Sequence, residues 1–150
     1  MDQVVRGGFV SAHDLRVSGF GEGYLHIDGV IHCAGGIVID VNKRLELLEG
    51  EGASTLVQTD SYRYHVRLPG QGSIFRYDSP HPIPENGVAP PHHLEHHVHR
   101  FDVLAGDKRG TIECIYDVER VPTLREVIDE AADWFYANTE AILRLGGKSP

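Results

Sequence analysis

One stretch decides the fold: Ser61-Tyr62-Arg63-Tyr64-His65-Val66-Arg67-Leu68, then Pro69-Gly70-Gln71-Gly72, then Ser73-Ile74-Phe75-Arg76-Tyr77-Asp78. Apolar and polar side chains alternate through its first part, which is the period of a half-buried strand. One face carries the apolar set, and the other carries Arg63, His65 and Arg67. Proline and glycine favour a tight turn in the middle. The stretch therefore predicts an antiparallel hairpin with one apolar face.

Weaker strand signals lie on both sides of this hairpin. A β-branched run occupies residues 37–41, and Asn42-Lys43 after it indicates a turn. Further strands are expected at 96–103 and 111–116, joined by a glycine-bounded turn. The sheet should therefore be mostly antiparallel.

The clearest helix signal comes near the end of the chain. Thr123 and Glu126 fit the S/T-x-x-E capping box. Apolar residues then recur at helical spacing until Gly146-Gly147, a typical helix stop. The predicted fold class is α+β: a curved, mostly antiparallel sheet with a long C-terminal amphipathic helix packed on it.

The size and composition suit one ordinary globular domain. The chain has 150 residues, 41% hydrophobic and 24% charged. We expect a single domain over residues 1–150, with a flexible or partner-ordered arm at 1–23 and a Pro/His-rich loop at 79–95.

Charge and the absence of certain patterns narrow the function classes. A net charge of −8 argues against a protein that coats nucleic acid by bulk electrostatics. No apolar run approaches the ~20 residues of a membrane span, and no secretory signal pattern is visible. Cys33 and Cys114 lie far apart and are expected to be reduced thiols. These features together predict a cytoplasmic protein without membrane contact.

The most unusual segment is Pro91-His92-His93-Leu94-Glu95-His96-His97-Val98-His99. If residues 96–101 are a strand, His97 and His99 share one face, while His96 and Arg100 share the other. His65 lies on a strand that is expected to neighbour this one. One sheet face would then carry several imidazoles beside arginines.

Two chemistries fit such a face. The first is acid–base catalysis, in which one neutral and one protonated histidine cleave RNA without metal while arginine holds the phosphate. The second is a site for zinc or another divalent transition metal, because histidines at i and i+2 on a strand can reach one ion. The metal alternative draws on His81, His92, His93 and His96 beside His97 and His99. A third alternative, a non-catalytic binding subunit, uses the acidic helix and the N-terminal arm as docking surfaces.

Four motifs in order resemble the TumE family, small prokaryotic proteins described as the toxin of a toxin–antitoxin pair. They are Tyr62-Arg63-Tyr64-His65-Val66, Phe75-Arg76-Tyr77-Asp78-Ser79-Pro80-His81, His96-His97-Val98-His99 and Pro122-Thr123-Leu124-Arg125-Glu126-Val127-Ile128. The family pattern has tryptophan where this chain has Tyr77. The resemblance spans roughly residues 35–135.

The resemblance implies a growth-inhibiting toxin neutralised by a cognate antitoxin protein. Combined with the histidines and arginines, it predicts a metal-independent endoribonuclease with RNA as substrate. The expected catalytic residues are His65, Arg76, Asp78, His97 and His99. The expected substrate-binding residues are Arg63, Tyr64, Arg67, Tyr77 and Arg100. The sequence leaves the oligomeric state open, a homodimer included.

Overall fold

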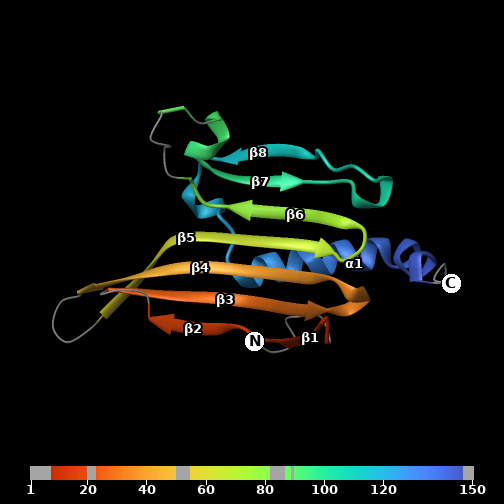
Figure 1. The fold of residues 1–150 in the computed structure, drawn as a ribbon, viewed down its shortest axis with the longest axis horizontal. Coiled ribbons are helices and arrows are strands. Elements are labelled where there is room, and N and C mark those ends of the chain that lie inside the picture. The colour runs from red at the N-terminus through yellow and green to blue at the C-terminus, as the bar shows by residue number, and fades with distance from the viewer. Residues whose placement is uncertain (1–7, 20–22, 50–54, 82–86, 89, 147–150) are drawn as a thin grey trace.

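The computed structural model describes residues 8–19, 23–49, 55–81, 87–88 and 90–146. Within them the chain forms one eight-stranded antiparallel sheet with a long helix, α1, packed on one face. Figure 1 shows α1 running behind the strands, which leaves the other face of the sheet uncovered. The predicted α+β class is confirmed.

The strands follow one another across the sheet as a meander. The order is β1-β3-β4-β5-β6-β7-β8, with β2 pairing beside β1 on the same edge of β3. The elements are β1 (Val10–His13), β2 (Arg16–Gly19), β3 (Tyr24–Cys33), β4 (Val38–Glu49), β5 (Thr55–Leu68), β6 (Gly72–Asp78), β7 (His96–Arg100), β8 (Thr111–Ile115) and α1 (Leu124–Gly146), with short 3-10 turns at Ala34–Gly36, Pro91–Leu94, Val103–Ala105 and Val118–Arg120.

The hairpin predicted from residues 61–78 is confirmed as β5 and β6. Tyr62, Tyr64 and Val66 are buried on one face, while Arg63 and His65 point to the other. The Gln71 N–H donates to the Leu68 carbonyl at 2.9 Å and closes the turn. The alternation read from the sequence therefore sets which side chains face α1.

Helix α1 begins at the predicted cap. The Thr123 hydroxyl accepts from the Glu126 N–H at 3.2 Å, and the Glu126 carboxylate accepts from the Thr123 N–H at 3.1 Å. These reciprocal bonds satisfy two backbone donors that the first turn leaves unpaired. Val127, Ile128 and Ala131 are fully or nearly fully buried and pack into the core cluster that contains Tyr64 and Val98. One face of the sheet thus belongs to the core, and α1 leaves the side chains of the other face uncovered.

The N-terminal segment and the expected turn after residue 41 differ from the sequence expectation. Residues 8–19 of the expected arm form β1 and β2, and Phe9 packs on Phe135 with ring centroids 5.8 Å apart. The rest of the expected arm, apart from Gly23, lies outside the described residues.

The predicted turn at Asn42-Lys43 is wrong, because β4 runs through it and pairs with both β3 and β5. Partners on both sides satisfy the backbone there, which outweighs a weak local turn preference.

The described part of the chain has no helix that combines the length and the apolar character needed to span a bilayer.

Candidate functional site

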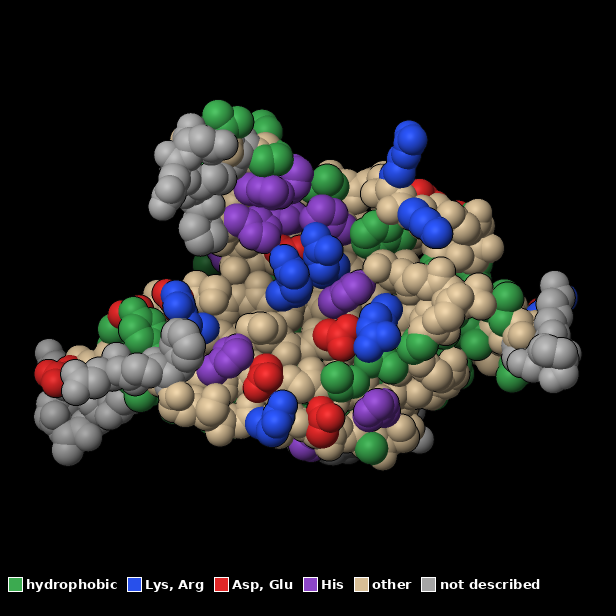
Figure 2. Space-filling model, in the orientation of Figure 1, with side chains coloured by type: hydrophobic (Ala, Val, Ile, Leu, Met, Phe, Trp, Pro, Cys, Tyr) green, Lys and Arg blue, Asp and Glu red, His purple; other side chains and the backbone are tan. Residues whose placement is uncertain are grey.

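The candidate site lies on the open face of the sheet, across β5, β6 and β7. Cross-strand pairing aligns the side chains there in two adjacent rows. The first row is Arg63, Asp78 and His97, and the second is His65, Arg76 and His99. Figure 2 shows this face, with histidines gathered next to arginine and acidic side chains. The prediction that imidazoles and arginines share one face is confirmed.

His97 is held in a defined orientation. Its side chain is 0% exposed, and its Nδ1 lies 2.9 Å from the Glu95 carbonyl oxygen. Because a carbonyl only accepts, Nδ1 must carry a proton and donate. In the neutral ring this leaves a lone pair on Nε2.

The Nε2 atoms of His97 and His99 are both buried and have no hydrogen-bond partner. Buried polar atoms without a partner are uncommon in folded proteins, and each one calls for an explanation such as an ion or an ordered water. Both atoms face Asp78 Oδ2, at 3.7 and 3.8 Å, which is too long for a direct hydrogen bond. The gap between these three atoms is the centre of the site.

Asp78 is a buried carboxylate held by two arginines. Its side chain is 2% exposed; Arg63 Nε donates to Oδ1 at 2.6 Å, and Arg76 Nε donates to Oδ2 at 2.7 Å. Burial raises the pKa of Asp78, but the hydrogen bonds from Arg76 and Arg63 outweigh it and hold the pKa below its usual value. Asp78 is therefore ionised at neutral pH.

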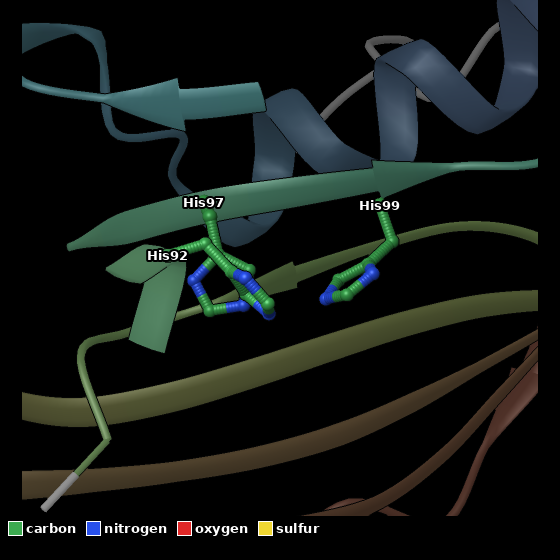
Figure 3. Close-up of side chains that lie close together, drawn as sticks. All are labelled: His92, His97 and His99. Carbon is green, nitrogen blue, oxygen red and sulfur yellow. The ribbon is translucent and has the colours of Figure 1, made fainter. Parts of the chain in front are cut away.

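The loop before β7 brings three more histidines to the same place. The 3-10 turn Pro91–Leu94 carries His92 and His93, and the His81 N–H donates to the His93 carbonyl at 2.6 Å. The His92 ring centroid lies 5.1 Å from that of His97 and 5.8 Å from that of His99. Figure 3 shows these three rings converging from the turn and from β7.

Two overlapping sets of potential metal ligands result. The ligand atoms of His92, His97 and His99 all lie within 4.8 Å of one another, and those of Asp78, His81 and His97 do the same. Both sets use His97, whose only free ring nitrogen is Nε2. One imidazole nitrogen binds one ion, so the two sets are alternatives for a single ion rather than a pair of sites.

Burial favours the neutral form of three of these imidazoles, those of His81, His92 and His99. It lowers the pKa of His99 to about 4, and the positive charge of Arg76 adds to the effect. The pKa values of His81 and His92 are also lowered by burial, with a smaller contribution from His93. A neutral imidazole is the form that binds metal, whereas a general acid must carry a proton.

Two residues of the open face have other partners. His65 Nε2 lies 2.7 Å from the Ser73 hydroxyl, and β6 separates His65 from β7 by two strand spacings, about 10 Å. His65 therefore does not neighbour His97 and His99 as the sequence suggested. Arg67 donates to Asp40 through Nε at 2.6 Å and Nη2 at 3.3 Å.

Four expected site residues lie on the face that packs against α1. Tyr64 is 1% exposed in the core. Tyr77 donates to Glu130 at 2.7 Å, and Arg100 donates to the same carboxylate at 2.6 Å. His96 Nδ1 lies 2.9 Å from the Tyr62 hydroxyl. The structure therefore places Tyr64, Tyr77, Arg100 and His96 away from the histidine cluster.

A hollow beside the cluster is lined by residues that no sequence motif singles out. It has a volume of ≈260 Å³, and Asn42 and Ser61 line it together with Arg63, Asp78 and His81. Asn42 faces Arg63 across the β4–β5 pairing. No local signal marks either residue, because only strand pairing brings them to the site.

Comparison of the chain with protein-family models, with curated proteins and with solved structures found no match.

Proposed function

We propose that this chain binds one divalent transition-metal ion through His92, His97 and His99, and that the ion is the centre of a hydrolytic site. One observation carries the proposal: two buried imidazole nitrogens, His97 Nε2 and His99 Nε2, have no partner and face the same gap. An ion in that gap satisfies both of them at once.

The ligand set fits Zn²⁺. Zinc binds imidazole nitrogen at about 2.0–2.1 Å, so three nitrogens now within 4.8 Å of one another need to close in by less than about 1 Å each. The bond from His97 Nδ1 to the Glu95 carbonyl is the support that metal-binding histidines commonly have, because it fixes the tautomer and the ring orientation.

Three histidines leave the fourth tetrahedral position open, as in catalytic zinc sites. An ion held this way lowers the pKa of water and polarises an ester bond. The chain supplies Asp78, whose ionised Oδ2 lies beside the gap and is placed to accept a proton. Arg63 and Arg76 keep that carboxylate charged.

The experiment is metal analysis of tag-free protein purified without chelator, followed by zinc titration of the stripped protein. We expect about one zinc per chain. His92→Ala and His97→Gln should each weaken binding by ~100-fold or more, since supporting contacts alone are worth 10–100-fold. His92 lies in a loop turn, so His92→Ala tests the site even if the buried variant, His97→Gln, fails to fold.

His96→Ala is the matched control, because His96 adjoins His97 in sequence and points to the other face, where its Nδ1 meets the Tyr62 hydroxyl. It should bind zinc as the wild type does. If the wild-type protein binds no zinc, or if His92→Ala and His97→Gln bind it unchanged, the gap holds only water and the proposal fails.

A metal-independent endoribonuclease toxin with a cognate antitoxin is the second candidate. One observation favours it: His65, Arg76 and His99, which belong to the motifs that resemble the TumE family, lie side by side on the open face of the sheet. The low pKa of His99 leaves that ring uncharged at neutral pH, so it suits the general-base role in such a pair and not the general-acid role. RNA cleavage that survives excess EDTA and is lost in His97→Gln would favour this candidate over the metal site.

A further inference from the structure

The arginines of the site have unused binding capacity. Arg63 and Arg76 each donate a hydrogen bond from Nε to Asp78. Within the described part of the chain their Nη groups have no hydrogen-bond acceptor. Two guanidinium groups share one carboxylate, so this part of the site carries one excess positive charge. The histidines beside it add none while they are neutral.

Both arginines remain accessible from the open face. The Arg63 side chain is 51% exposed and that of Arg76 is 27% exposed. Arg63 also borders the hollow that Asn42 and Ser61 line, and these two side chains offer further hydrogen-bond donors there. Figure 2 shows two adjacent basic side chains directly beside the histidines.

The arginines and the histidine gap lie next to each other. Asp78 Oδ2 accepts from Arg76 Nε at 2.7 Å and faces His97 Nε2 at 3.7 Å. One carboxylate oxygen therefore separates the Arg76 guanidinium from the position of the ion. A ligand with several oxygens can reach both.

We propose that the open position of the metal and the Nη groups of Arg63 and Arg76 together form a subsite for the phosphoryl group of a substrate. The inference rests on the proposed metal site and names the class of substrate that the site takes, a phosphate ester.

Charge and shape favour phosphate over a carboxylate. With a divalent ion in place, the excess positive charge of the ion, Asp78 and the two arginines rises to three, which requires an anionic partner. A carboxylate has two oxygens, whereas a phosphoryl group has enough to contact the ion and both guanidinium forks at once. A guanidinium group can donate two parallel hydrogen bonds to two phosphate oxygens. These bonds orient the phosphate as well as attract it.

The test is calorimetric titration of zinc-loaded protein with inorganic phosphate and, separately, with a ten-nucleotide single-stranded RNA. Arg63→Lys and Arg76→Lys keep a positive charge beside Asp78 but lose the planar pair of guanidinium N–H donors. We expect each to weaken phosphate binding about 10-fold, the value of one charge-assisted hydrogen bond, while the zinc content stays the same as in the wild type.

Arg44→Lys is the matched control, since Arg44 also donates Nε to one carboxylate, that of Asp60 at 2.6 Å, but lies outside the cluster. It should bind phosphate as the wild type does. RNA binding that is tighter than phosphate binding and equally sensitive to both variants identifies a nucleic-acid phosphodiester as the source. Equal binding of the two probes identifies a small phosphate ester.

The inference is overturned if zinc-loaded protein binds neither probe, or if both arginine variants bind them as the wild type does. Failure of the underlying metal site has a different signature, because zinc itself then does not bind.

Discussion

At the scale of single residues, Asp78 organises the site. It is the cross-strand partner of both Arg63 and His97, and it is buried together with His97. A carboxylate placed there costs desolvation energy, which the two arginine hydrogen bonds offset. Without its charge, the guanidinium groups would lose their hydrogen-bond acceptors and their orientation.

Asp78→Asn should therefore lower the free energy of unfolding by about 2–3 kcal/mol. This is less than the 3–5 kcal/mol typical of a fully buried pair, because Arg63 is half exposed. Urea denaturation of metal-free protein measures it. Asp60→Asn is the control at the more exposed pair with Arg44, with an expected cost below about 1 kcal/mol. Equal costs for the two variants would mean that Asp78 has no special structural role.

At the scale of elements, strand alternation decides which side chains lie on the open face of the sheet. The N-terminal cap fixes where helix α1, which covers the other face, begins. Along β7, His97 and His99 point to the open face while Val98 joins the core under α1. The same rule sends Arg100 and His96 to the helix side. The site therefore depends on α1 occupying the apolar face and leaving the other free.

Thr123→Ala should destabilise the protein by about 1 kcal/mol, because the Glu126 N–H loses its acceptor at the first turn of α1. Thr123→Ser keeps the hydroxyl and should stay within a few tenths of a kcal/mol. Thermal or urea unfolding compares the two. An alanine variant as stable as the serine variant would show that the cap contributes nothing.

At the scale of the whole molecule, the metal ion should act as a ligand of the folded state. The set of His92, His97 and His99 is complete only when the Pro91–Leu94 turn meets β7, so the unfolded chain lacks the preformed site. Zinc at about 100 times its dissociation constant should then add about 2.7 kcal/mol of stability.

For a domain of this size that gain raises the melting temperature by roughly 5–10 °C, and excess EDTA should reverse it. Scanning calorimetry of stripped and zinc-loaded protein measures the shift. His92→Ala should remove most of it, and His96→Ala should keep it. A melting temperature that does not respond to zinc in the wild type would contradict a preformed site.

Local sequence patterns specify the central hairpin, the capped C-terminal helix and the side of β5, β6 and β7 on which a residue lies. These features depend on spacing of two or 3.6 residues and on local caps and turns, so neighbours along the chain specify them. That is why His97 and His99 were correctly placed together and His96 apart from them.

Outside the central hairpin, tertiary contacts determine which strands are neighbours and which histidines the loop adds to the site. The pairing of β6 between β5 and β7 separated His65 from the histidine cluster and brought Asp78 to its centre. The turn at Pro91–Leu94 supplied His92, and β3 gave β1 and β2 their partner. These placements are contacts between segments distant in sequence, and no local periodicity encodes which distant segment completes a hydrogen-bond ladder or closes a site.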